Sequence, residues 1–342
     1  MIMYWVYVSQ NKAFQAQCAL DGIPSGECNL LDKLINDFKS VNIFWAFVTV
    51  ACFQLSNIVR SIRWKMIFEP MGYTIKFSNA FWTIMIGYLA NLGLSRAGEV
   101  VRAASLAKFE HIRLDKVIGT VALDRILDLL TMGVVVILAF TLQYQEIYNY
   151  LAENMKDFDF SAFLRGTIFQ SFAFGILLLV LLLVIFNRQV RKSVIYIKII
   201  DFVKGFYEGI RVIKRIKQPL VFILLSLSIW LLYFLMTYFA FFSFEPTSGL
   251  GMKAALLVFV FGSFGILIPS PGGMGTYHAL VVAALAVYGI QGGDAFSYAN
   301  IVFFFVQILT TITFGIMGII FMRLDNRHYL PHHSYLSEKE PI

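Results

Sequence analysis

The chain has 342 residues, of which 58% are hydrophobic and 14% charged, and its mean hydropathy is +0.72. Soluble domains are about 45–50% apolar and about 25% charged, so this composition excludes an ordinary soluble protein and predicts an all-α, polytopic bundle of transmembrane helices. The formal net charge is +7, and the stretch between Arg188 and Lys217 alone holds nine Lys/Arg against two acidic residues, which favours anionic lipid headgroups over nucleic acid as its partner.

The first eight residues, MIMYWVYV, are apolar but too few to cross a bilayer. An offset of 175 residues aligns them with the apolar segment 167–186, so we expect them to be the end of a truncated first span. The alternative is a short interfacial anchor. Cys18 and Cys28 follow in one polar segment. The sequence leaves open whether they form a disulfide or remain two free thiols.

A helix needs about 20 predominantly apolar residues to cross a hydrocarbon core of about 30 Å. Five segments meet this requirement, and they predict one integral membrane domain over residues 1–342. The predicted spans are residues 41–59, 117–143, 167–186, 219–242 and 297–322.

Loops rich in Lys and Arg face the cytoplasm, and this bias orients the spans. The strongly basic segment 187–218 is predicted to lie on the cytoplasmic membrane surface as an amphipathic helix, whereas the acidic loop 144–166 is predicted outside. Segments 60–76 and 96–116 are also basic and are predicted inside, together with the C-terminal tail 323–342.

The apolar segment 78–95 lies between two basic segments, which would be on opposite sides if it crossed the membrane completely. We therefore predict a re-entrant hairpin over residues 78–108 that enters from the cytoplasm and turns near Leu94–Gly98. Both basic segments then remain on one side of the membrane.

A second re-entrant hairpin is predicted over residues 253–290, where apolar stretches of 16 and 14 residues flank PSPGGMGT. As helices these stretches would reach only about 24 and 21 Å, and the prolines and glycines between them interrupt a helix. The outer ends, near Gly251 and Gly292, are predicted outside, so this hairpin enters from the opposite face.

The two hairpins lie in halves of the chain that correspond at an offset of 175 residues, about 1–143 and about 167–322. With the mirrored topology, this correspondence predicts an inverted repeat. Folds of that kind bind their substrates where broken helices meet near the bilayer midplane. The identities at this offset are Ala80 with Ala255, Gly87 with Gly262, Ser95 with Ser270 and Gly98 with Gly273.

Ionisable side chains at membrane depth are costly, so those of the first hairpin are candidates for function. Arg96, Glu99 and Arg102 recur at helical spacing in LSRAGEVVR and share one face. One interpretation is that Arg96 and Arg102 bind a lipid phosphate, whose oxygens match the guanidinium fork. The alternative is that Glu99 neutralises an arginine and fixes the hairpin.

The next span carries further charges in ALDRILD. Asp124 and Asp128 are one helical turn apart and Arg125 precedes Asp128 by three residues, so ion pairs within the helix, or with Arg96 or Arg102, are expected. We favour a buried lock between hairpin and span, with headgroup binding as the functional alternative. An acid/base site built on the paired carboxylates is another alternative, but no nucleophile or metal-ligand spacing accompanies them.

The glycines of the second hairpin permit backbone conformations that other residues resist. A helix that begins near Met274 would direct its amide donors into the membrane interior, where they could bind an anion. His278 would lie in its first turn, either as a headgroup contact or as a hydrogen-bonded structural histidine. The candidate headgroup-binding residues of this hairpin are Ser270, Gly272, Gly273, Gly275, Tyr277 and His278.

The motifs LSRAGEVVR, ALDRILD and PSPGGMGTYH, in this order, resemble the transmembrane region of lysylphosphatidylglycerol synthases and the related flippase-like UPF0104 membrane proteins. The resemblance covers Val41 to Arg323 and implies an inner-membrane protein linked to translocation of phospholipids or lipid-linked glycans. Relatives often carry Glu where Asp124 and His278 stand here. The signature positions that it implies are Arg96, Glu99, Arg102, Arg125, Asp128 and the turn Pro269–Gly275.

These features predict a lipid flippase or translocase that handles a phospholipid or polyprenyl-linked headgroup, without enzymatic activity, cofactor or metal of its own. The alternative is the membrane component of an aminoacyl-phosphatidylglycerol synthase system. In the full synthases a soluble catalytic domain follows the membrane part, whereas here about twenty residues follow the last predicted span. A membrane scaffold is a third hypothesis.

Overall fold

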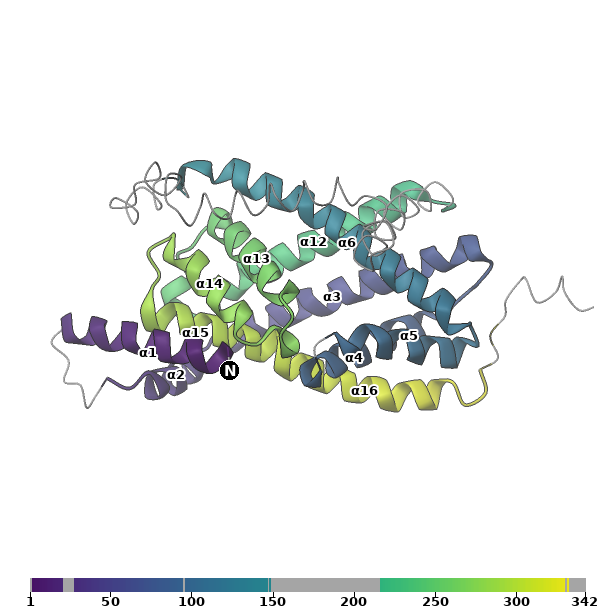
Figure 1. Cartoon of the computed structure of the whole chain (residues 1–342), viewed down its shortest axis with the longest axis horizontal. Coiled ribbons are helices and arrows are strands. Elements are labelled where there is room, and N and C mark those ends of the chain that lie inside the picture. The colour runs from purple at the N-terminus through teal and green to yellow at the C-terminus, as the bar shows by residue number, and fades with distance from the viewer. Residues whose placement is uncertain are drawn as a thin grey trace, which may run out of the picture. The chain divides into compact units, whose positions relative to one another are not determined.

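Every regular element that the computed structural model describes is a helix. The chain divides into two compact units, Met1–Gln143 with Val212–Ile342, and Tyr144–Arg211. The helices labelled in Figure 1 belong to the first unit. The predicted span 167–186 and most of the basic segment 187–218 lie outside the described residues. The structure describes residues 2–20, 28–94, 96–146, 148, 216–329 and 331.

Four of the described helical segments are long and apolar enough to cross a membrane, and they confirm four of the five predicted spans. The shortest has 23 residues, and at 1.5 Å per residue it reaches about 35 Å, more than the thickness of a hydrocarbon core. The segments are α3 (Ile43–Phe68) with the 3-10 turn η1 (Glu69–Met71), α6 (Leu114–Leu142), α12 (Pro219–Phe241), and the composite segment Gly292–Asp325.

The composite segment contains a π-helix between two α-helices. In the π-helix the backbone hydrogen bonds join residues five apart instead of four, and Thr310 N–H accordingly bonds to Phe305 O. This wider turn changes the face that the following helix presents. The three parts are α15 (Gly292–Val302), the π-helix η4 (Phe303–Leu309) and α16 (Thr310–Asp325).

Where the first re-entrant hairpin is predicted, the structure has a pair of packed helices, α4 (Phe77–Gly93) and α5 (Ala97–Glu110). Arg96 ends the connection between them in the left-handed conformation, with φ of 66°. The helices cross very closely at Gly87 and Gly98, since a Cβ atom added to Gly98 would lie 2.0 Å from the carbonyl oxygen of Gly87. Only glycine fits at this crossing.

A pair of packed helices also occupies the segment where the second re-entrant hairpin is predicted. Gly272, Gly273 and Gly275 have φ of 60°, 83° and 87°, values that glycine adopts without a steric cost and that the turn therefore requires. A Cβ atom added to Gly265 would lie 2.6 Å from Cα of Tyr277, so this hairpin too is closed through a glycine. Its elements are α13 (Met252–Leu267), the 3-10 turn η3 (Pro271–Gly273) and α14 (Thr276–Ala286).

The turn of the second hairpin meets the end of the first. The turn η3 contacts α4, and a Cβ atom added to Gly272 would lie 2.9 Å from the Leu92 side chain. The helix α4 also packs on α16 (Figure 1), where Gly315 leaves room for Leu89. The first hairpin thus contacts both the last span and the tip of the second hairpin.

The N-terminal apolar stretch belongs to a helix longer than its first eight residues, α1 (Ile2–Leu20), which packs on α14 and α15 (Figure 1). A second helix, α2 (Leu30–Lys39), follows it and contacts α15. Cys18 and Cys28, whose pairing the sequence leaves open, are joined by a disulfide. This bond ties the end of α1 to the residue pair that precedes α2.

Lys33 fastens α2 to the beginning of α15. Its ammonium group lies 2.7 Å from Asp294 and 3.0 Å from Asp37. Burial lowers the pKa of Lys33, but the hydrogen bonds and charges of the two carboxylates outweigh burial and raise it.

The residues after α16 are fastened to the base of the first hairpin. The side-chain amides of Asn326 and Asn79 donate to each other at 2.7 and 2.9 Å. Tyr329 donates to Glu110 at 3.1 Å, and burial, together with the Glu110 carboxylate, raises the pKa of Tyr329 to about 12. The predicted tail 323–342 therefore begins with residues that pack on the helices.

Candidate functional site

A cluster of buried charged side chains joins α3 to α6. Arg60 and Arg63 of α3 are 3% and 0% exposed. Nη1 of Arg60 lies 2.5 Å from Oδ2 of Asp128. Nη2 of Arg63 lies 2.5 Å from Oδ1 of Asp124 and 2.6 Å from Oδ1 of Asp128. The members of each pair are about one turn apart on their own helix, so the two helices present matching charges to each other.

The positions of Arg60 and Arg63 correct the prediction for residues 60–76. The sequence predicts a basic cytoplasmic loop there, but α3 continues through the first part of it and buries both arginines. Burial is possible because each guanidinium group finds carboxylates, which offset the cost of removing the charge from water. The positive charge that remains to orient this segment comes from Lys65 and Lys76.

The first hairpin joins the cluster through Arg102 of α5. Its Nη1 atom lies 3.2 Å from Oδ2 of Asp124, and its guanidinium carbon lies 3.7 Å from the ring centroid of Trp64, in a cation–π arrangement. Arg102 is 3% exposed, yet its Nε and Nη2 atoms have no hydrogen-bond partner within the described part of the chain. Buried donors without partners cost about 1–3 kcal/mol each, so these two groups are candidate ligand contacts.

A second contact between the hairpin and the span is the ion pair of Glu99 and Arg125, whose Oε1 and Nε atoms are 2.7 Å apart. Nη1 of Arg125 also lies 3.7 Å from Oδ2 of Asp128, which confirms the pair predicted within this helix. With the contact of Arg102 and Asp124, these pairs make the lock between hairpin and span that the sequence favours. Glu99 neutralises an arginine of the span and not one of its own hairpin.

The cluster carries more positive than negative charge. Four guanidinium groups face three carboxylates, which leaves a formal charge of +1. An uncompensated charge is costly in apolar surroundings, so the cluster is suited to receive one further anion. Its members are Arg60, Arg63, Arg102 and Arg125 with Glu99, Asp124 and Asp128.

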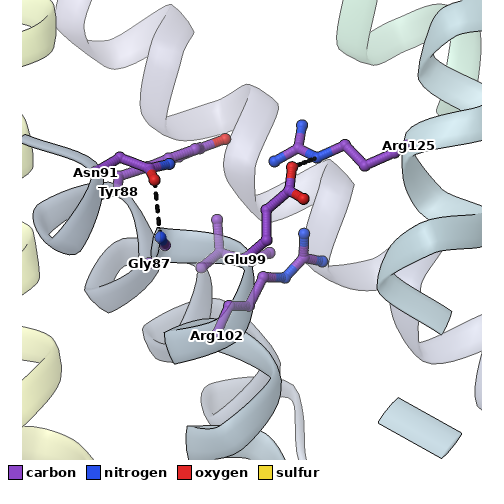
Figure 2. Close-up of a pocket in the computed structure, with 8 residues that line it drawn as sticks. Gly87, Tyr88, Asn91, Glu99, Arg102 and Arg125 are labelled. Carbon is purple, nitrogen blue, oxygen red and sulfur yellow. Dashed lines mark hydrogen bonds and ion pairs between the residues drawn. The ribbon is translucent and has the colours of Figure 1, made fainter. Parts of the chain in front are cut away.

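A small pocket opens beside Arg102 and Arg125, and Figure 2 shows both guanidinium groups directed toward Glu99. On the α4 side, Asn91 accepts a hydrogen bond from the backbone N–H of Gly98 at 2.8 Å, which holds the first turn of α5 in place. The pocket is therefore walled by α4, α5 and α6. Its lining residues are Ile84, Gly87, Tyr88, Asn91, Gly98, Glu99, Arg102 and Arg125.

Two tyrosines extend the polar contacts beyond the charged groups. Nη2 of Arg60 donates to the hydroxyl of Tyr233 on α12 at 3.4 Å, and Tyr88 donates to Oδ1 of Asn57 on α3 at 3.1 Å. The site thus receives side chains from α3, which precedes the first hairpin, from α6, which follows it, and from α12. Within the described ranges, no group of three His, Cys, Asp or Glu side chains is arranged to hold a metal ion.

Arg96 lies outside the cluster. It is exposed at the start of α5, and it makes no ion pair with any residue that the structure describes. The left-handed turn at this position directs the chain into α5, so the helical spacing of Arg96 with Glu99 and Arg102 does not continue through it. The structure brings together the other five candidates of the first half: Glu99, Arg102, Asp124, Arg125 and Asp128.

The candidates of the second hairpin form a separate group of hydrogen bonds. The hydroxyl of Thr276 donates to the carbonyl of Gly265 at 2.6 Å and lies 2.9 Å from the hydroxyl of Ser270. His278 is 1% exposed and lies in the first turn of α14, as predicted, where its Nδ1 atom accepts a weak hydrogen bond from Gly275 N–H at 3.4 Å. Among the described residues, no hydrogen bond or ion pair joins this group to the charged cluster.

Sequence reasoning missed Arg60 and Arg63, although a signal for them was present. Two aspartates one turn apart in an apolar span require cations, and SNIVRSIRW carries two arginines at the matching spacing. The arginines are close to Lys65 at the end of an apolar stretch, and charged residues at such a position are equally typical of a cytoplasmic loop. Tyr88 and Asn91 carry no sequence signal, because their role depends on how α4 packs against α5.

Comparison with known proteins identifies a family of membrane proteins. A family model described as the lysylphosphatidylglycerol synthase TM region matches residues 30–315. A UPF0104 membrane protein from Methanocaldococcus jannaschii is 25% identical over 279 residues, which cover 76% of this chain and 80% of the relative. No solved structure matches the chain. The matched region contains both hairpins and every member of the charged cluster.

Proposed function

This chain belongs to the lysylphosphatidylglycerol synthase transmembrane-region family, and on that premise we propose that it is a lipid translocase. It moves the headgroup of a phospholipid or a polyprenyl-linked lipid between the two leaflets, and it forms or breaks no bond itself. The membrane is its site of action, and the four apolar helices are consistent with a multi-pass protein.

The observation that carries this proposal is the unsatisfied positive charge at Arg102. Its Nε and Nη2 atoms are buried at the wall of the pocket without a hydrogen-bond partner among the described residues, in a cluster of formal charge +1. A headgroup phosphate would supply the missing anion, because its oxygens match the two parallel donors of a guanidinium group. The carboxylates balance most of the arginine charge, so the phosphate is bound weakly enough to be released.

The arrangement of the helices supports an inverted repeat. Met252, the first residue of α13, comes 175 residues after Phe77, the first residue of α4. In each half a long helix is followed by a 3-10 turn that begins Glu-Pro, by a helix hairpin and by a second long apolar segment. The turns are η1 (Glu69–Met71) and η2 (Glu245–Thr247).

Contacts within the two hairpins also correspond at this offset. A Cβ atom added to Gly87 would lie 3.1 Å from the side chain of Arg102, and one added to Gly262 would lie 3.0 Å from the side chain of Tyr277. Both pairs are related by the same 175 residues. Between the halves, α4 packs on α16 and α13 packs on α6, which are the equivalent pairs of a twofold arrangement.

The lengths of the hairpin helices support re-entry into the membrane from opposite faces. The helices α4, α5, α13 and α14 have 17, 14, 16 and 11 residues, and so reach about 17 to 26 Å, less than a hydrocarbon core of about 30 Å. The contact of η3 with α4 brings one tip to the other helix pair. We propose that the lipid headgroup passes beside these tips while its tails stay in the bilayer.

We propose an inner-membrane location with the C-terminus in the cytoplasm. The basic segment 188–217 would then lie on anionic headgroups of the cytoplasmic leaflet. The disulfide of Cys18 and Cys28 supports the same orientation, because disulfides persist in oxidising compartments. The disulfide lies near α2, which Lys33 joins to Asp294 at the start of α15. The sequence predicts that Gly292, the first residue of α15, lies outside.

A flipping assay tests the proposal. We expect the purified protein to move a fluorescent phospholipid between the leaflets of liposomes, and Arg102→Gln to lower the rate at least about tenfold through the loss of a charge-assisted hydrogen bond. Arg102→Lys, which keeps the charge but loses the fork, should give an intermediate rate. The measurement is the fraction of fluorophore quenched from outside over time.

Arg113→Gln is the matched control, because Arg113 pairs with Asp115 at the surface, where their side chains are 76% and 64% exposed. Its flipping rate should equal that of the unmodified protein. All variants are compared by gel filtration and thermal unfolding to exclude misfolding. An unchanged rate in a folded Arg102→Gln variant would contradict phosphate binding at this site.

The family description favours one second candidate, the membrane component of an aminoacyl-phosphatidylglycerol synthase system. In that function the same cluster would hold the lipid acceptor for the catalytic domain of that system. The two functions separate in the liposome assay, because a synthase component would bind phosphatidylglycerol without flipping it.

A further inference from the structure

One ion pair of the charged cluster differs from all the others in its exposure. The side chains of Glu99 and Arg125 are 43% and 37% exposed, whereas those of Asp124 and Asp128 are 0% and 10% exposed. Glu99 also lines the pocket together with Arg102. Figure 2 shows its carboxylate between the two guanidinium groups and directed at Arg125. Glu99 is therefore the one anion of this cluster that can leave without opening the protein interior.

The geometry of this ion pair is also loose. Nε of Arg125 is 2.7 Å from the Glu99 oxygen, yet the N–H does not point along that direction closely enough to make a hydrogen bond. A strong arginine–carboxylate pair is bidentate and aligned. The contact thus retains the Coulomb attraction of an ion pair without the directional part of the interaction.

From these observations we propose that Glu99 is a tethered counter-anion, which the phosphate group of the substrate displaces from Arg125. The phosphate then bridges Arg125 and the free donors of Arg102, and it lies where the Glu99 carboxylate lies in the unloaded protein. This inference deepens the proposed function and rests on it, since it assigns a step of phosphate binding at the same cluster.

The phosphate supplies the one negative charge that the cluster lacks. Glu99 moves off Arg125 but stays on α5 beside the site, so a group with one negative charge brings the formal charge from +1 to zero. No charge is then left buried without a partner, which is the costly state for an ion in apolar surroundings. The chemistry that fits is therefore a monoanionic phosphodiester, as found in diacyl phospholipid headgroups.

The displaced carboxylate has a second place to bind. Glu99 is the third residue of α5, and the side chain of the N-cap residue Arg96 makes no capping hydrogen bond. A glutamate at this position can turn back and accept a hydrogen bond from the backbone N–H of the N-cap residue, here Arg96. The positive end of the helix dipole also favours a carboxylate there. Glu99 can thus alternate between Arg125 and the start of its own helix.

The test measures binding to the full chain in a phosphate-free detergent by titration calorimetry, with dioctanoyl phosphatidylglycerol and inorganic phosphate as separate probes. Glu99→Gln removes the competing anion, so we expect it to bind phosphatidylglycerol about two- to fivefold more tightly, the range that a partly exposed ion pair contributes. Glu99→Asp, whose shorter side chain reaches Arg125 less well, should show a smaller increase.

Asp115→Asn is the control for the change in net charge, because Asp115 pairs only with the surface residue Arg113 among the ion pairs of the described residues. Its affinity should be unchanged. Tighter binding of phosphatidylglycerol by Glu99→Gln supports displacement by a headgroup, and tighter binding of inorganic phosphate alone supports displacement by a soluble phosphate.

Unchanged or weaker binding of both probes by Glu99→Gln would overturn the inference. If the unmodified protein still flips lipid in that case, the proposed function stands and only the role of Glu99 fails. If no variant binds either probe and no flipping occurs, both the inference and the proposed function fail.

Discussion

Asp124 is the most heavily shared carboxylate of the buried cluster, with guanidinium nitrogens of Arg63, Arg102 and Arg60 at 2.5, 3.2 and 3.4 Å. Asp124→Asn leaves these cations partly uncompensated, and we expect a loss of about 3–5 kcal/mol in the free energy of unfolding. The exposed Asp115→Asn should change it by less than about 0.5 kcal/mol. Denaturant unfolding in detergent micelles measures both, and equal losses would contradict the structural role of the cluster.

At the residue scale, the sequence could predict those members of the site whose charge is energetically costly to bury in an apolar stretch. Charged residues inside apolar stretches are conspicuous, so Glu99, Arg102 and Asp124 are identifiable from the sequence alone. The sequence alone does not distinguish Arg60 from an arginine at a membrane surface, because its burial depends on a partner 64 residues away. Arg96 lies outside the cluster because a single left-handed residue redirects the chain.

Among the helices, the crossing of α4 and α5 sets the position of Arg102, and it depends on Gly98. Gly98→Ala would place a methyl group against the backbone of Gly87, at the 2.0 Å approach, so the helices must separate. We expect a loss of at least about 2 kcal/mol in the free energy of unfolding, as for overpacked cores, and a flipping rate lowered together with it.

Gly119→Ala on α6 is the matched control for this change. A Cβ atom there meets nothing within 4 Å, and alanine is the better helix former by about 0.5–1 kcal/mol. Thermal unfolding of the two variants should therefore shift in opposite directions. A Gly98→Ala variant as stable as the unmodified protein would show that the hairpin tolerates a wider crossing.

The elements themselves were largely predictable, because apolar length and helix breakers are local properties. The breaks at residues 94–96 and 268–275 fall where glycine, proline and short apolar stretches place them. The ends of the spans were less predictable. The helix α3 runs to Phe68, nine residues past the predicted end at 59, because Asp124 and Asp128 permit its arginines to stay inside.

For the molecule as a whole, the central expectation is that the hairpin tips lie within the membrane. In a Cys52→Ala background, whose other two cysteines form the disulfide, a cysteine at Met274 should react slowly with a membrane-impermeant maleimide. A cysteine at Ser248, in the exposed turn before α13, should react fast from outside. The rates of labelling in intact cells or sealed vesicles measure this difference.

Equal labelling rates at the two positions would place residues 269–278 in an outer loop and would contradict re-entry. The comparison is informative because side-chain exposure alone does not explain a slow reaction at Met274, which is 39% exposed in the structure. Only surrounding lipid would shield it. The sequence and the helix lengths predict this burial in lipid.

The π-helix in the last span has a consequence for how this chain can vary in length. Removing one residue from 303–309 would restore ordinary helical turns and rotate α16 by about 100° relative to α15. Gly315 would then turn away from Leu89, and a larger side chain would meet the first hairpin instead. The rotation of α16 relative to α15 therefore depends on the exact number of residues in the π-helix. A substitution in it alters one contact, whereas a deletion of a single residue alters every contact that follows.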